Sequence, residues 1–122
     1  MTWMGALAVF IGGGLGSLAR FGMSALFKTL DLAHLPFATL ASNILSCVIV
    51  GWIALRFAPP PQSTIYLFIA IGFCGGFSTF STFSLETLQL MRNGQMIWAV
   101  ANVVVSIIAC ISLLYMLSKP LE

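Results

Sequence analysis

Hydrophobic residues dominate four long stretches of the chain, and short polar or proline-rich stretches separate them. The separating stretches are KTLDLAH at 28–34, APPPQS at 58–63 and RNGQ at 92–95. About 20 apolar residues of helix cross the hydrocarbon core of a bilayer. The pattern therefore predicts four membrane-spanning helices, at about 3–27, 36–57, 64–91 and 96–117.

Composition supports this interpretation. The chain has 122 residues, of which 60% are hydrophobic and only 7% are charged. Soluble domains carry about 25% charged residues, so this chain has too few charges to cover a soluble globule. We expect a single all-α membrane domain over residues 1–122, embedded in the lipid bilayer and with no nucleic-acid partner.

The third predicted span is longer than a straight crossing needs, and it contains the stretch GFCGGFSTFSTFS at 72–84. Glycine weakens a helix by roughly 1 kcal/mol relative to alanine. Irregular backbone at membrane depth persists where it is buried in protein or lines a wet cavity. We therefore expect a break near 75–79, whose free carbonyl groups suit a structural cation. An intact helix in which Gly72 and Gly76 permit close packing is the alternative.

Basic residues give the chain almost no preferred orientation. Lys28 and Arg92 lie in the first and third connections, whereas Arg56 and Lys119 lie at the opposite ends of the spans. Lys and Arg normally accumulate on the cytoplasmic side of a membrane protein. Equal counts favour insertion in both directions and an antiparallel homodimer, and Arg20, inside the first span, shifts the count only slightly. A fixed topology set by partner proteins is the alternative.

Polar side chains inside the spans gather on particular helix faces. Thr39, Asn43 and Ser46 share one face of the second span, because they are spaced i, i+4 and i+7. Asn102 and Ser106 do the same on the fourth span. After the predicted break, hydroxyl residues alternate with phenylalanines, in the order Phe80, Ser81, Thr82, Phe83 and Ser84. Intramembrane polar groups usually face an interior or a pathway, so these faces predict a polar track.

The chemistry of this track favours an anion. No carboxylate lies at the centre of a span, and Glu86 lies toward the end of the third. Hydroxyl and amide groups donate hydrogen bonds, and the edge of an aromatic ring is electropositive. The track therefore suits a small, hard anion. Hydrogen bonds to the residue's own helix or to a neighbouring helix are the alternative for each hydroxyl taken alone.

The three cysteines are Cys47, Cys74 and Cys110, and all of them fall inside apolar segments. They show no C-x-x-C spacing and have no histidine nearby. We interpret them as small buried hydrophobic residues, with no metal-binding or disulfide role indicated by the sequence.

Three motifs resemble those of the small bacterial fluoride channels known as the Fluc or CrcB family. The motifs are GGGLGSLARF at 12–21, PFATLASNILSCVIVG at 36–51 and GFCGGFSTFSTFSLE at 72–86, and the resemblance as a whole covers essentially the whole chain. The resemblance implies a passive, fluoride-selective channel that exports fluoride from the cytoplasm across the bacterial inner membrane. It also implies an antiparallel dual-topology homodimer with two pores.

The resemblance further implies roles for individual residues. The family's fluoride pathway falls on two phenylalanines, one asparagine and three hydroxyl residues: Phe80, Phe83, Asn43, Ser81, Thr82 and Ser84. Its central structural Na⁺ is held by backbone carbonyls at the dimer interface, and these fall on Gly75 and Ser78. Arg20 matches the family's first-span arginine, and we expect Arg20 and Glu86 to have structural or vestibule roles. The chain departs from many members in having serine, not threonine, at position 78.

Two other classes of membrane protein share some of these features. A small dual-topology drug/proton exporter has similar size and weak charge bias, but it should carry a membrane-embedded carboxylate in its first span. An assembly subunit without transport activity would leave the broken third span and its polar track unexplained. No nucleophile–base pair or metal-ligand cluster is present in the sequence, so we do not expect an enzyme.

Overall fold

The computed structural model describes residues 2–119, and the regular elements in that part of the chain are all helices. Glu122, one of the three acidic residues, lies outside the described residues. The elements are α1 (Trp3–Thr29), α2 (Phe37–Gly51), the π-helix η1 (Trp52–Phe57), α3 (Thr64–Tyr66), the π-helix η2 (Leu67–Phe73), α4 (Cys74–Phe77), α5 (Phe80–Arg92) and α6 (Met96–Ser118).

These elements join into four helical stretches that are long and apolar enough to cross a membrane. The stretches are Trp3–Thr29, Phe37–Phe57, Thr64–Arg92 and Met96–Ser118. The second contains η1 as its last turn, and the third runs from α3 through η2 and α4 to α5. The prediction of an all-α protein with four membrane-spanning helices is therefore confirmed.

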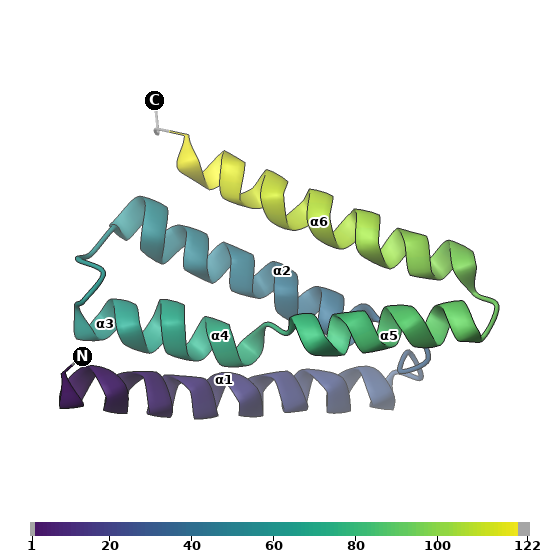
Figure 1. Cartoon of the computed structure of the whole chain (residues 1–122), viewed down its shortest axis with the longest axis horizontal. Coiled ribbons are helices and arrows are strands. Elements are labelled where there is room, and N and C mark those ends of the chain that lie inside the picture. The colour runs from purple at the N-terminus through teal and green to yellow at the C-terminus, as the bar shows by residue number, and fades with distance from the viewer. Residues whose placement is uncertain (1, 120–122) are drawn as a thin grey trace.

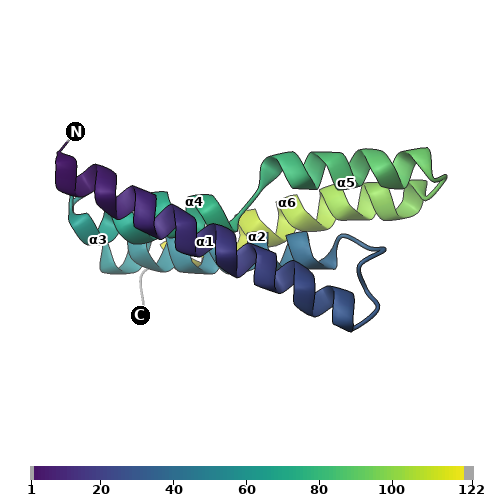
Figure 2. The same ribbon diagram turned by 90° about the horizontal axis from the view of Figure 1, so that it is seen from below.

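The four stretches lie side by side in a flat bundle (Figure 1). Helix α1 packs along α3, η2 and α4, and α2 packs against α1, α4 and α6. Helix α6 packs against α2 and α5. Turned by 90°, the chain steps sideways between α4 and α5, so that α5 lies with α6 rather than with α1 (Figure 2). The step places the start of α5 beside the middle of α2.

Small residues bring α1 close to η2 and α4. A Cβ atom at Gly16 would collide with the carbonyl oxygen of Phe73, and one at Gly76 would collide with the carbonyl oxygen of Gly13. Only glycine permits backbones to approach this closely, as at the small-residue interfaces of other membrane helices. The contact makes α1 a continuous support for the first half of the third stretch.

The interruption of the third stretch is narrower than expected. Helix α4 continues to Phe77, and only Ser78 and Thr79 are extended, with φ/ψ of −77°/158° and −155°/121°. The sequence predicted a break from Gly75 onward, and the structure places Gly75 inside α4. Gly76 stays helical because its lack of a side chain lets α4 pack on α1, so this glycine serves packing rather than unwinding.

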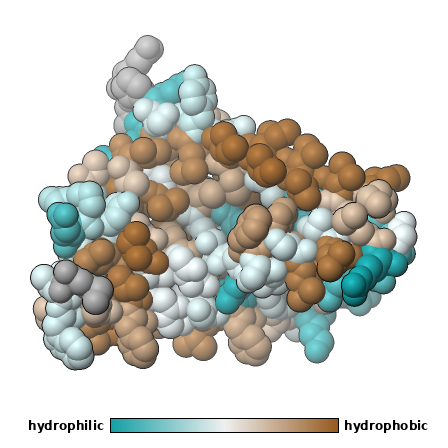
Figure 3. Space-filling model, in the orientation of Figure 1, coloured by the Kyte–Doolittle hydropathy of each residue, from teal (hydrophilic) through white to brown (hydrophobic). Residues whose placement is uncertain are grey.

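The outer surface is largely apolar. Bulky side chains such as Phe10, Phe21, Ile97 and Ile108 are exposed on the outward faces of α1 and α6. Strongly hydrophobic residues follow the upper edge, along α6, and form patches elsewhere on the visible face (Figure 3). Residues of intermediate hydropathy fill much of its middle, and the more hydrophilic patches gather mainly toward the ends of the bundle. In water such a surface would aggregate, and its extent fits a protein that is surrounded by lipid or by further membrane helices.

We predict that Gly16→Ala destabilises the fold by about 1–3 kcal/mol, the usual effect of overpacking a close contact. The new methyl group would press on the Phe73 carbonyl and separate α1 from α4. Unfolding of the purified protein in detergent measures the change. Gly14→Ala on the same helix is the matched control, because a Cβ there meets nothing within 4 Å. Equal stability of the two variants would contradict the close-packing role.

Candidate functional site

The side chain of Asn43 holds the interruption between α4 and α5. Its Oδ1 accepts a hydrogen bond from the Thr79 backbone N–H at 2.9 Å, and its Nδ2 donates to the Thr79 carbonyl oxygen at 3.5 Å. Asn43 lies in the middle of α2, and 36 residues separate it from Thr79. An amide side chain has one donor group and one acceptor, which match the backbone N–H and C=O of a single residue. Asn43 therefore satisfies the Thr79 N–H, which has no helical acceptor, and adds a second bond to the Thr79 carbonyl.

The Thr79 hydroxyl starts the next helix. Its Oγ1 accepts from the Thr82 backbone N–H at 3.2 Å, which makes Thr79 the N-cap of α5. The same Oγ1 donates to Thr82 Oγ1 at 3.0 Å, and Ser81 Oγ lies 3.4 Å away. Two of the three predicted track hydroxyls thus gather around Thr79. The third, Ser84, donates to the Phe80 carbonyl oxygen of its own helix at 2.9 Å.

An open groove of about 520 Å³ lies beside this interruption, between α2, α4, α5 and α6. Five of the predicted site residues line it: Asn43, Gly75, Ser78, Phe80 and Phe83. Ser81, Thr82 and Ser84 are not among its lining residues, although Ser81 and Thr82 reach it indirectly through Thr79. The structure therefore brings together the asparagine, the two phenylalanines and both residues whose carbonyls were assigned to a cation.

The groove is apolar with a few hydrogen-bond donors. Phe80 and Phe83 lie with their ring centroids 5.7 Å apart and their planes inclined by 33°. The hydroxyls of Ser46 and Ser106, from α2 and α6, also line the groove. Both are buried without a hydrogen-bond partner among the described residues. None of the lining residues in that part of the chain is charged.

The other two predicted residues lie away from this groove. Glu86 borders a smaller cavity of about 260 Å³ near the first and third connections, where His34 and Gln89 also line the wall. Its Oε1 accepts from Thr39 Oγ1 at 2.8 Å, and its Oε2 is buried with no partner among the described atoms. Arg20 is half-buried on α1 and borders neither cavity.

Sequence reasoning missed several residues of the site. Thr79 entered it only as part of a motif, and its contact with Asn43 joins distant parts of the chain. The bond between Asn102 Nδ2 and Thr87 Oγ1, at 2.9 Å, links α6 to α5 and was not foreseen. Ser46 and Ser106 were not missed, because the sequence already placed each of them on a polar helix face with an asparagine. No feature of the sequence indicated that the three cysteines would converge on the groove.

The family model described as CrcB-like protein, Camphor Resistance (CrcB), matches residues 7–117. The chain belongs to this family. The match includes the groove, the interruption and the packing glycines. It confirms the assignment that the three sequence motifs suggested, to a family of ion channels and not of enzymes.

Curated relatives carry a functional name. The chain is 45% identical over 103 residues to a "Fluoride-specific ion channel FluC" of Serratia proteamaculans, which covers 83% of this chain and 80% of that protein. A protein of the same name from Methylobacterium radiotolerans is 39% identical over 117 residues, and the aligned region covers 91% of this chain and 80% of that protein. The protein of this name from Pyrococcus abyssi is 39% identical over 112 residues, and the aligned region covers 90% of this chain and 89% of that protein.

We predict that Thr79→Val weakens the start of α5 by about 1 kcal/mol, the usual effect of losing an N-cap hydroxyl. Valine keeps the shape of threonine but removes the bonds to Thr82. Hydrogen exchange of the amides in the first turn of α5 measures the change, and it should be faster in this variant. Thr79→Ser keeps the hydroxyl and serves as the control. The cap would have no role if both variants exchanged like the unmodified protein.

Proposed function

We propose that the protein is a passive, fluoride-selective channel that lets fluoride leave the bacterial cytoplasm across the inner membrane. The names of the relatives support the substrate, and the composition and four spanning helices support a multi-pass membrane location. The groove beside the interruption of the third stretch is the proposed conduction site. Asn43, Phe80 and Phe83 are its central residues, and the interruption lies near the middle of the membrane.

The observation that carries this proposal is the chemistry of the groove wall. It offers phenylalanine rings and unpartnered serine hydroxyls, and it carries no charge. Hydroxyl groups donate to an anion, and ring edges complement negative charge. A wall without fixed cations binds an anion weakly enough for it to leave again, which conduction requires. Ser81, Thr82 and Ser84 continue this path along α5 toward Glu86.

A second copy of the chain is expected to complete the site. Phe80 is 80% exposed although it lines the groove, and the groove is open to the surface of the chain. One chain alone therefore does not enclose a path through the bilayer. The balanced basic residues favour a partner in the opposite orientation, and such an antiparallel homodimer would have two equivalent grooves and two pores.

The residues at the interruption fit a structural Na⁺. Thr79 N–H, which would continue the helix by donating to the Gly75 carbonyl, donates instead to Asn43. The Gly75 carbonyl is thereby left without its helical donor, and a Cβ at Gly75 would meet nothing within 4 Å. Ser78 is extended, so its carbonyl is also outside the helical pattern. Carbonyl oxygens are suitable ligands for a hard cation. Gly75 and Ser78 of both copies would supply four of them.

The drug/proton exporter is a weaker candidate. Glu86 is the one acidic residue inside a membrane-capable stretch, and it borders the smaller cavity near the connections rather than the central groove. Its Thr39 partner also occupies one of its oxygens. An exporter that exchanges protons for a bulky substrate requires a carboxylate at the substrate site, and the central groove has none among its lining residues.

We predict rapid fluoride efflux from liposomes that contain the purified protein, with negligible chloride efflux and no need for a proton gradient. A fluoride electrode records the release. Phe80→Ile should lower the rate at least tenfold by removing a ring edge from the wall. Asn43→Asp should do the same, because it replaces the Nδ2 donor and adds a negative charge beside the path.

Phe10→Ile is the matched control for this experiment. Phe10 is 78% exposed on α1 and does not border the central groove, so its replacement should leave the fluoride rate within about twofold. Absence of fluoride release from vesicles shown to contain folded protein would overturn the channel proposal. Normal rates in both Phe80→Ile and Asn43→Asp would remove the groove from the pathway.

We predict that Na⁺ stabilises the dimer. Transfer of the detergent-purified protein into a buffer with N-methylglucamine as the sole cation should lower the unfolding temperature and the dimer fraction, and millimolar Na⁺ should restore both. Ser78→Ala should respond in the same way, because it changes the hydroxyl and keeps the carbonyl. An unmodified protein whose unfolding temperature and dimer fraction did not change with Na⁺ would refute the Na⁺ site. If only the Ser78→Ala variant lost the response, the Na⁺ ligand would be the Ser78 hydroxyl and not its carbonyl.

A further inference from the structure

All three cysteines of the chain line the central groove, although they are far apart in the sequence. Cys47 is on α2, Cys74 on α4 and Cys110 on α6. All are free thiols. Cys74 is only 4% exposed, whereas Cys47 and Cys110 are each half-buried. The fold therefore gathers soft sulfur ligands at one place that the spacing of the sequence did not indicate.

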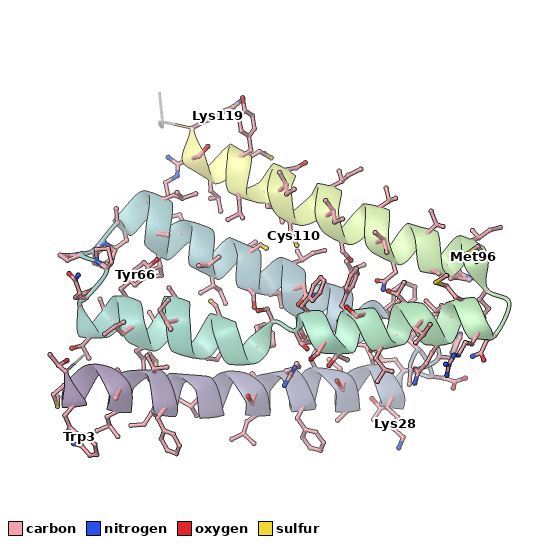
Figure 4. All side chains as sticks on the ribbon, viewed as in Figure 1. Trp3, Lys28, Tyr66, Met96, Cys110 and Lys119 are labelled. Atoms are coloured by element: carbon pink, nitrogen blue, oxygen red, sulfur yellow. The ribbon has the colours of Figure 1, made fainter. Side chains whose placement is uncertain are left out.

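Cys47 and Cys110 form a pair within this group. Of the two other thiols, Cys110 interacts more strongly with the side chain of Cys47, and Cys74 acts on it more weakly. Helices α2 and α6 pack against each other, which holds both backbones in place. Cys110 lies on the side of α6 that faces α2 (Figure 4). Among the described residues, no group of three or more histidine, cysteine or acidic side chains is placed to hold a metal ion, so the unit to consider is two thiols.

We propose that Cys47 and Cys110 form a two-thiolate site for a soft, thiophilic metal ion of the Hg²⁺ class. Soft thiolate ligands select soft metals. Hg²⁺ is commonly bound by two sulfurs in a line, so a pair of facing thiols is sufficient. On binding, each S–H bond is replaced by an S–Hg bond, and two protons leave to water. One divalent ion thus replaces two protons, and the net charge of the site does not change.

Charge balance explains why a divalent ion suits this position. The groove has no charged lining residue in the described part of the chain, and burying an uncompensated charge in such surroundings costs several kcal/mol. A bis-thiolate of Hg²⁺ is neutral, whereas that of a monovalent soft ion carries one negative charge. Hard cations such as Na⁺ prefer oxygen ligands, so this site is chemically separate from the carbonyls of Gly75 and Ser78.

The groove also offers a route to the pair. Ser46 and Ser106, each one position or one turn from a cysteine of the pair, line the same space with unpartnered hydroxyls. If the groove is the fluoride pathway, a bound mercuric ion narrows it and should inhibit efflux at least tenfold. This consequence rests on the proposed function. Metal binding itself does not, so the site is tested first without any transport measurement.

The test is retention of Hg²⁺ by the full-length protein in detergent. One equivalent of mercuric chloride is added, excess glutathione is applied as a competing monothiol, and the mercury that stays with the protein after desalting is measured. Two preplaced thiols hold the ion by their high effective concentration, which a single thiol lacks. We expect about one Hg²⁺ per chain in the unmodified protein. Cys47→Ser and Cys110→Ser should each retain less than a tenth of that amount.

Cys74→Ser is the matched control, because it removes the third groove thiol and leaves the pair, and it should retain the metal. Thiol titration should find three free thiols before the addition and one afterward. Equal loss of mercury from the unmodified protein and the single variants would overturn the proposal. So would loss in Cys74→Ser, a mercury-bridged dimer on a gel, or a pair already oxidised on purification. If fluoride efflux were absent but mercury were retained, the channel proposal would fail and the metal site would stand.

Discussion

The exchange of hydrogen bonds between the Asn43 side chain and the Thr79 peptide is the interaction on which the rest of the site depends. A helix interrupted inside a protein leaves donors and acceptors that must be satisfied elsewhere. From a neighbouring helix, Asn43 accepts from the Thr79 N–H, which has lost its acceptor in α4, and also donates to the Thr79 carbonyl. This permits Ser78 and Thr79 to stay extended, and Thr79 then caps α5 through its own hydroxyl. The positions of Phe80 and Phe83 follow, because they lie on the first turn of the helix so started.

This arrangement needs a rigid support on its other side, and α1 provides it. The backbone of α4 lies directly on the backbone of α1 because glycines occupy the contact. A side chain at Gly76 would push the last turn of α4 away from α1 and displace Ser78 relative to α2. The glycines and the asparagine therefore act on the same two-residue segment from opposite faces. The glycines set the position of α4 against α1, and the asparagine binds the backbone of Thr79, which follows α4.

The hydropathy pattern predicted the four spans well because helix length and apolar composition are properties of contiguous sequence. The break was placed too early, since a glycine that loosens a helix and a glycine that permits close packing are identical in sequence, and Gly75 and Gly76 proved helical. Contacts such as Thr39 with Glu86 and Asn43 with Thr79 span 47 and 36 residues. Periodicity shows which side chains share a face of one helix, but not which face meets which neighbour.

The same limit explains the cysteines. Each one alone fits the description of a small residue in an apolar helix, and no local spacing distinguishes it. Their shared groove arises only when α2, α4 and α6 are packed together. A wall that avoids fixed charge must draw its polarity from hydroxyls, amides, ring edges and thiols. Of these groups, thiols are the ones that bind soft metals. An uncharged wall that includes a pair of thiols therefore gains an affinity for soft metal ions, and this affinity is separate from the hydrogen bonds that a small anion would use.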